Sequence, residues 1–191
     1  EVDTKDFNNL ILTQCNLLKY PDNDIDEDGI NDTSDFLIGN ASRINTNIIG
    51  IDLTINESGD LSKHKEGIQK VKFHRNNLIL LEFEFNFSNS SKLDFTTVSI
   101  LNTSNSTLGS ILVYGINLSQ SFTKTLYLEK INNELNGVCI KDAEILNINE
   151  ITDFCTGSNE FKIECDGISQ NGYICTYNSS SNLYEISGLK H

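Results

Sequence analysis

The stretch ILLEFEFNF, residues 79–87, alternates apolar and polar side chains with a period of two. Side chains on a β-strand point alternately to opposite faces, so this period separates the residues into two sets. The apolar set, which we expect on the buried face, is Ile79, Leu81, Phe83, Phe85 and Phe87. Glu82, Glu84 and Asn86 then face water, as is typical of an antiparallel sheet with one solvated side.

Similar strand patterns, enriched in Val, Ile, Thr, Phe and Tyr, recur between residues 44 and 131. They are IIGIDLTI at 48–55, VKFH near 71, LDFTTVSIL at 93–101, ILVYGINL at 111–118 and FTKTLYLEKI at 122–131. Clusters of Asn, Ser and Gly separate these runs. The pattern predicts a mainly β protein, with an antiparallel β-sandwich of the jelly-roll or Ig-like type over residues 40–136.

After residue 136 the sequence changes to short strand-like runs spaced by turns. These runs are GVCIKD, AEILNI, NEFKIEC, GYICTY and NLYEISGL. Four of the five cysteines lie here, at Cys139, Cys155, Cys165 and Cys175, and none has C-x-x-C spacing, which favours disulfides over a zinc site. A segment of this length buries little apolar area, and disulfides would compensate for its small core. We therefore expect residues 137–191 to form a small disulfide-bearing β module.

The pairing of these cysteines is open at the level of sequence. Cys165 and Cys175 flank the turn signal SQNG, which makes a bridge across a hairpin geometrically easy. Cys139 with Cys155 is then the simplest remaining pair. Four cysteines allow three pairings, and Cys15 is left over as a free, buried or intermolecular thiol. The alternative reading is five buried thiols in a reducing compartment.

Residues 22–35, DNDIDEDGINDTSD, carry seven acidic side chains and no Lys or Arg. A solvated acidic linker would explain the charge, but the spacing favours a calcium loop. Counted from Asp24, the residues fall at positions 1, 3, 5, 6, 9 and 12 of an EF-hand loop. The expected ligands are the carboxylates of Asp24, Asp26, Asp28, Asp32 and Asp35 with the backbone carbonyl of Ile30, around a turn at Gly29. Ca²⁺ is the expected cofactor because alternate carboxylates on a tight turn converge on one point.

This loop resembles thrombospondin type 3 calcium repeats and the half-motif of dockerin modules. The resemblance implies a bound Ca²⁺. The last ligand is Asp35 where helix-loop-helix sensors have Glu, and no amphipathic helix follows, so a structural ion is expected over a switch. A dockerin needs a second copy of the motif, so its docking function does not carry over. The carboxyl-terminal run from VCIKDAEILNINEITDFC to NLYEISGLKH resembles the cysteine-bearing endings of cell-surface proteins from small-genome archaea, which implies an extracellular, cell-surface location.

Other features also point outside the cell. The chain begins with Glu1 and contains no Met, so we expect a leader to have been removed, rather than an excised fragment. Nine N-x-[ST] sequons exceed what the abundance of Asn, Ser and Thr alone predicts. Asn31 lies inside the acidic loop and is expected to stay unmodified. The glycosylation sites that we predict are Asn40, Asn56, Asn86, Asn89, Asn102, Asn105, Asn117 and Asn178.

Charge and motifs limit the remaining functions. The net charge of -13 repels phosphate backbones, so we expect no nucleic-acid partner. No run approaches the roughly 18 apolar residues of a membrane helix, so we expect no membrane span. His64, His74 and His191 fall in no metal or catalytic spacing. Glu82 and Glu84 are the candidates for a glycosidase-type pair, but the solvated face of a strand explains them better, so we do not expect an enzyme.

Together these features predict an extracellular structural protein, a calcium-stabilised glycoprotein that is a subunit of a cell-surface filament or surface layer. The expected partner is a second copy of the chain. Residues 1–39 would form an amino-terminal arm and the calcium loop, and the apolar first 20 residues could donate a strand to a neighbour's sheet. The segment at residues 6–19 fits either a helix or a strand. The alternative is an adhesin or carbohydrate-binding module of a larger surface protein, which would bind surface glycans.

Overall fold

The structure is a computed structural model that describes residues 23–25, 29–61, 65–88, 92–118, 121–152 and 154–191. Within these residues the regular elements are fourteen β-strands and two 3-10 turns, η1 (Ala41–Arg43) and η2 (Ile148–Glu150). The mainly β class is therefore confirmed. Cys15 and the expected strand donor at the amino terminus lie outside the described residues.

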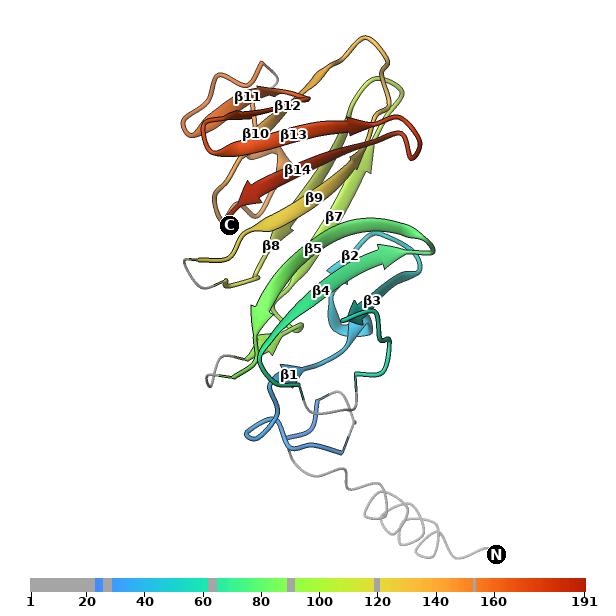
Figure 1. Ribbon diagram of the computed structural model, residues 1–191, viewed down its shortest axis with the longest axis vertical. Helices are drawn as coiled ribbons and strands as arrows, with labels where there is room; N and C mark the ends of the chain where they lie inside the picture. Colours follow the sequence, from blue (N-terminus) through green and yellow to red (C-terminus); the bar gives the residue numbers. More distant parts are fainter. Residues whose placement is uncertain (1–22, 26–28, 62–64, 89–91, 119–120, 153) are drawn as a thin grey trace, which may run out of the picture.

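The largest sheet has seven strands in the order β12-β13-β14-β9-β5-β4-β3, and all neighbouring strands are antiparallel (Figure 1). They are β3 (Ile51–Ile55), β4 (Ile68–Arg75), β5 (Leu78–Asn86), β9 (Lys124–Glu129), β12 (Asp166–Gln170), β13 (Tyr173–Asn178) and β14 (Leu183–Leu189). Since β14 pairs with β9, one sheet crosses the boundary that the sequence predicts after residue 136. The division of the chain into domains stays a prediction.

Three smaller sheets complete the described part. They are β2 (Asn45–Thr46), β7 (Ser99–Ser104) and β8 (Gly109–Tyr114) in one sheet, β1 (Leu37–Ile38) with β6 (Leu93–Asp94), and β10 (Gly137–Lys141) with β11 (Glu160–Glu164). The β1–β6 and β2–β7 pairs are parallel, which the alternation pattern does not predict.

Two buried clusters of apolar residues lie against the large sheet. The first joins β3, β4 and β5 to β7 and β8, so that the two sheets pack in a sandwich-like way. The second joins the β10–β11 hairpin to β13 and β14. Leu126 of β9 packs against both clusters, which makes β9 the strand where the two cores meet.

The strand predicted from ILLEFEFNF at residues 79–87 is β5. Leu81, Phe83, Phe85 and Phe87 are all buried, as the period of two requires. Ile79 is the exception: Phe73 of β4 pairs with Leu81 and His74 pairs with Ile79, which leaves Leu80 as the extra residue of a bulge. The bulge shifts the alternation, so Leu80 is buried while Ile79 is half-buried.

The run at 93–101 forms two strands where the sequence predicts one. After β6, the side chain of Asp94 accepts hydrogen bonds from the backbone N–H and the hydroxyl of Thr96, at 2.9 and 2.6 Å. Asp side chains that bond to the backbone two residues ahead favour a turn over an extended chain. The chain therefore turns at 95–98 before β7 begins.

The run AEILNI at 143–148 is not a strand. Asn147 caps η2 by accepting a hydrogen bond from the N–H of Asn149 at 2.9 Å, and Glu150 bonds back to the N–H of Asn147 at 3.1 Å. This reciprocal capping box ends the extended conformation before residue 148. The strand expectation for this segment is wrong because local capping outweighs its apolar pattern.

Truncation of Phe73 tests how much the first cluster contributes to stability. Its ring is fully buried and lies 6.3 Å from the Phe83 ring and 5.7 Å from the Phe95 ring, centroid to centroid. We expect Phe73→Ala to lower the free energy of unfolding by roughly 3–5 kcal/mol, measured by urea denaturation. Ile49→Ala is the control, because Ile49 is 92% exposed, and it should change stability by less than about 0.5 kcal/mol. Equal effects of the two variants would contradict the assignment of the core.

Candidate functional site

The acidic loop is described in part. Asp24 and Asp35 are buried and Asp32 is half-buried, whereas the expected ligands Asp26 and Asp28 lie outside the described residues. Gly29 has φ +92°, a backbone conformation that favours glycine. Its N–H donates to Oδ2 of Asp24 at 3.0 Å, and the N–H of Ile25 donates to Oδ1 of Asp32 at 3.1 Å. Two of the acidic side chains therefore hold the turn closed.

The loop is attached to the β structure by neighbouring cations. The guanidinium of Arg43 donates to the carbonyl of Ile25 at 3.0 Å, and the ammonium of Lys92 donates to the carbonyl of Asp32. Oδ1 of Asp35 accepts from the N–H of Leu37 at 3.0 Å, where β1 begins. These contacts leave the loop fixed against η1, β1 and the residue before β6.

The described carboxyl groups do not by themselves form a cation cage. Among the residues that the structure describes, Asp24, Asp32 and Asp35 do not bring three ligand oxygens within 4.8 Å of one another. Ile30 is half-buried at its expected place in the loop. The calcium site stays a prediction, and it depends on Asp26 and Asp28 as well.

Both disulfides form with the simplest pairing. Cys139 of β10 bonds to Cys155, and Cys165 at the end of β11 bonds to Cys175 of β13. Glu160 lies within 4.8 Å of the first bridge, but both sulfurs are used in that bridge, so this cluster is not a metal site. The first bridge joins β10 to the segment that leads into β11, and the second bridge ties the residue after β11 to β13 of the large sheet.

Glu160 also organises the turn beside the first bridge. Its carboxylate accepts hydrogen bonds from Thr152 and from the N–H of Gly157, the latter at 2.8 Å. The hydrogen bond from the Thr152 hydroxyl is the main reason why the pKa of Glu160 lies below its usual value. Glu160 is therefore a structural carboxylate.

The Asn residues of the sequons also have a conformational role. In five of them the Asn side chain accepts a hydrogen bond from the backbone N–H two residues ahead, which is an Asx-turn. These five are Asn31, Asn40, Asn86, Asn105 and Asn178. Asn56, Asn105, Asn117 and Asn178 are exposed, Asn40, Asn86 and Asn102 are half-buried, and Asn89 lies outside the described residues. Turn formation alone can explain part of the sequon excess, and glycosylation stays a prediction.

Glu82 and His74 have structural partners for their side chains, His191 makes a contact through its backbone, and Glu84 is exposed on β5. Glu82 forms an ion pair with Lys70 across the β4–β5 pair, with 2.8 Å between the carboxylate oxygen and Nζ. Nδ1 of His74 lies 3.0 Å from the carbonyl of Asn76 in the following turn. His191 donates its backbone N–H to Asp142 at 2.7 Å, and His64 lies outside the described residues.

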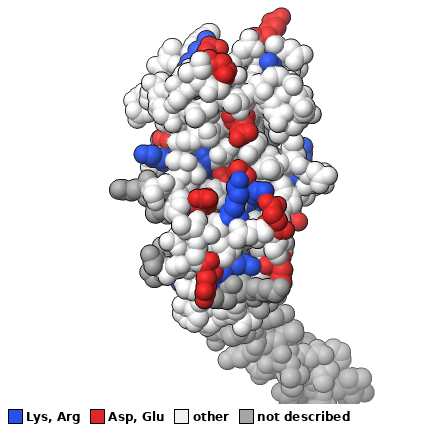
Figure 2. All heavy atoms as spheres, in the orientation of Figure 1, with Lys and Arg blue, Asp and Glu red and all other residues white. Residues whose placement is uncertain are grey.

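Basic side chains do not gather into one patch on the face that Figure 2 shows, where Lys and Arg lie in small groups near acidic residues. Lys72 of β4 is paired with Glu57, and the ammonium of Lys65 donates to the carbonyl of Asp60 at 2.8 Å. In the basic stretch at 62–75, Lys65, Lys70 and Lys72 thus make local contacts.

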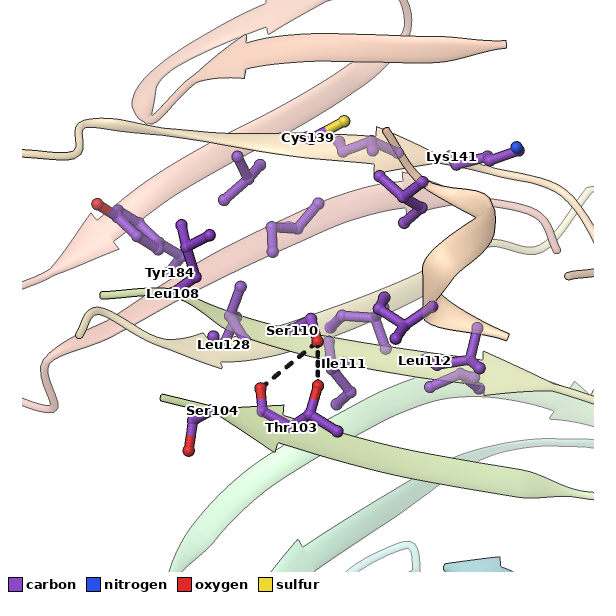
Figure 3. A pocket seen from close by; sticks show the side chains of 18 of the residues that line it. Thr103, Ser104, Leu108, Ser110, Ile111, Leu112, Leu128, Cys139, Lys141 and Tyr184 are labelled. Atoms are coloured by element: carbon purple, nitrogen blue, oxygen red, sulfur yellow. Dashed lines mark hydrogen bonds between the residues drawn. The ribbon is translucent and has the colours of Figure 1, made fainter. Parts of the chain in front are cut away.

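A cavity of about 670 Å³ lies between β8, β10 and the large sheet (Figure 3). Its floor includes Leu126 and Leu128 of β9 and Tyr184 and Ile186 of β14. The segment from Asp142 to Thr152, which contains η2, supplies further lining residues. In Figure 3 the hydroxyl of Ser110 lies at hydrogen-bonding distance from Thr103 of β7, beside the apolar floor. No pattern in the sequence indicates this cavity, because strands from distant segments form it.

Lys124 is a second feature that the sequence did not reveal. It lies in β9 between Phe83 and Leu189 and is only 1% exposed. Its Nζ donates to the carbonyl of Ile116 at 3.4 Å. Burial lowers the pKa of Lys124, and the nearby charges of Glu144 and Asp142 oppose that shift in part. The alternation in FTKTLYL places Lys124 on the same face as Leu126, and this is the signal that could have marked it.

No family model, curated protein or solved structure matches this chain. Among the described residues, no helix has the length and apolar character that a membrane crossing requires.

Replacement of Lys124 tests the effect of its burial. The unfolded chain binds more protons than the folded chain between the lowered pKa and 10.5, so stability rises with pH in that interval. We expect Lys124→Met to be more stable than the unmodified protein at pH 7 and to lose this advantage as pH approaches 10.5.

The measurement is urea denaturation as a function of pH, with Lys162→Met as the control. Lys162 is exposed on β11, so its replacement makes the same change in net charge without changing a buried group. Lower stability of Lys124→Met at pH 7 would show that the attraction to Glu144 and Asp142 outweighs the burial.

Proposed function

We propose that this chain is an extracellular structural protein, the calcium-stabilised and glycosylated subunit of a cell-surface filament or layer. The observation that carries the proposal is the combination of two disulfides with a mainly β fold and an acidic loop anchored at its edge. Disulfides persist in oxidising compartments, outside the cytosol. We also propose that residues 40–136 are a β-sandwich of the jelly-roll or Ig-like type.

The role of the ion in this proposal is to stiffen a junction. The loop precedes β1 directly, and its described contacts run to η1, β1 and Lys92. A cation bound by Asp24, Asp26, Asp28, Asp32, Asp35 and the carbonyl of Ile30 would neutralise the repulsion among these carboxylates. It would thereby set the direction in which the amino-terminal arm leaves the β structure.

The glycans in this proposal cover the outer surface. The exposed sequons Asn56 and Asn178 lie at or beside ends of strands of the large sheet, and Asn105 lies in the turn between β7 and β8. Bulky glycans at such sites favour solubility and hinder pairing between exposed strand edges.

Removal of calcium tests the loop. At a free Ca²⁺ concentration a hundredfold above Kd, binding adds about 2.7 kcal/mol to stability, which corresponds to a rise in Tm of roughly 5–10 °C. We expect EDTA to remove this increment and Asp26→Asn to weaken it, as measured by calorimetry at several Ca²⁺ concentrations. Asp52→Asn, an exposed site in β3, is the control and should keep the full Ca²⁺ response. A Tm that does not depend on Ca²⁺ in the unmodified protein would exclude a structural ion.

Assembly is tested by negative-stain electron microscopy of the whole chain and of a form that lacks residues 1–20. We expect ordered polymers from the whole chain and monomers from the truncated form, because the arm is the proposed link between subunits. Intact polymers without the arm would refute its role. Stable monomers of the whole chain that bind immobilised glycans would instead favour an adhesin or carbohydrate-binding module.

A further inference from the structure

The cavity beside β8 and β10 has walls and a floor of different kinds. Its floor takes the alternate residues Leu126 and Leu128 of β9 and Tyr184 and Ile186 of β14, as expected for one face of a sheet, together with the last residue of each strand. Its walls take consecutive residues, 109–113 of β8 and 137–141 of β10. A cavity that meets consecutive residues of a strand faces the edge of that strand, because its two faces each display only every second residue.

Both walls are unpaired strand edges. Within the described residues, β8 pairs with β7 alone and β10 pairs with β11 alone. The N–H and C=O groups along such an edge are ready to pair with another extended chain. The layer that covers the large sheet is thus split into β2-β7-β8 and β10-β11, and the cavity lies between the two parts, where the segment with η2 supplies a further part of its lining (Figure 3).

The length of the two walls and the apolar part of the floor suit one apolar strand. Five residues of an extended chain span about 17 Å, which matches the five-residue run that each wall contributes. The floor residues Leu126, Leu128 and Ile186 offer apolar contacts to every second side chain of an inserted strand. Leu108 and Leu135 also line the cavity and are 57% and 41% exposed, so the apolar surface continues to its mouth.

We propose that this cavity binds residues of the amino-terminal segment of a second copy of the chain, as an added β-strand between β8 and β10. This inference rests on the proposed function and names the surface that receives the arm. Residues 7–20 read FNNLILTQCNLLKY, in which LIL and LL are the apolar runs and Lys19 is the one charge. A segment with so few charges suits the apolar part of the cavity lining, in which Leu and Ile are the commonest residues.

The position of the arm's attachment favours a neighbour over the same chain. The residues that follow the arm lead into β1, which lies near one end of the molecule, whereas β10 and β11 lie at the other end (Figure 1). An extended segment of 22 residues spans at most about 75 Å, so its length allows insertion into the same chain as well. The experiment must therefore distinguish the two sources of the strand.

Cross-linking with isotope labels identifies the donor. The whole chain carries Cys15 in the arm, and Ser110→Cys places a thiol on the β8 wall (Figure 3). ¹⁴N and ¹⁵N chains are mixed in equal amounts before assembly, oxidised and digested. We expect a disulfide between Cys15 and position 110, with about half of the linked peptides carrying both isotopes, as random pairing between chains requires. Thr176→Cys, an exposed site on β13, is the control and should give no such link.

Hydrogen exchange tests whether the bound segment is a strand. A chain that lacks residues 1–20 is mixed with a synthetic peptide of residues 6–20 in which Cys15 is replaced by Ser. We expect exchange to slow at least tenfold at amides within 109–113 and 137–141, because the new strand pairs with both edges. A peptide with Leu10→Asp and Leu12→Asp should not protect them. Leu108→Asp at the exposed mouth should weaken binding of the unmodified peptide, whereas Thr125→Asp, on the same sheet outside the cavity, should leave it unchanged.

Each result decides one question. If every link carries a single isotope, the arm inserts into its own chain, and the proposed partner is overturned. Absence of both links and protection would overturn the cavity as the receptor. If electron microscopy shows polymers in that case, the filament proposal stands and only the receptor is wrong. If links carry both isotopes but no polymers form, the receptor stands and the filament proposal is wrong.

Discussion

The pairing of β9 with β5 on one side and β14 on the other is the constraint on which the described structure depends. β9 is the middle strand of the seven-stranded sheet, and Leu126 contributes to both buried clusters. Without these ladders the early strands and the disulfide-bearing hairpin would each lose the floor against which they pack. Lys124 lies at the same junction, so the molecule places a buried cation where its two halves meet. Lys124 is only 1% exposed, and this burial lowers its pKa.

Local rules explain which parts of the fold the sequence could predict. The period of two identified β5 because hydrophobic burial acts on each side chain in turn, and the turn signal at Asn171 and Gly172 identified the hairpin that Cys165 and Cys175 bridge. The two wrong strand predictions, at 93–101 and 143–148, also have local causes. The Asp94 side chain and the Asn147–Glu150 capping box stabilise turns inside runs with strand-like composition. Pairing between distant segments, such as β14 with β9 or the parallel β2 with β7, leaves no period in a single sequence.

The two candidate sites also differ in whether the sequence could predict them. The acidic loop was predictable because all its expected ligands lie within twelve consecutive residues, and its offsets follow from the geometry of one turn. The cavity was not predictable from the sequence, because its walls and floor come from segments around residues 110, 127, 139 and 185. Alternation in β9 predicts that Leu126 and Leu128 share a face, but only the arrangement of β8 and β10 shows that this face is incompletely covered.

The placement of the two sites has a consequence for the kind of assembly. The acidic loop leads into β1 near one end of the molecule, and β10, which lines the cavity, lies near the other. An interface that joins two different surfaces of identical subunits is heterologous, and it repeats without limit unless the rotation between subunits happens to close a ring. In the proposed assembly, the angle between arm and β structure would decide between these outcomes, and the loop that would set this angle is attached by Arg43, Lys92 and Asp35. A cation in the loop would hold this angle constant from one subunit to the next, so the ion need not touch the interface to determine the form of the polymer.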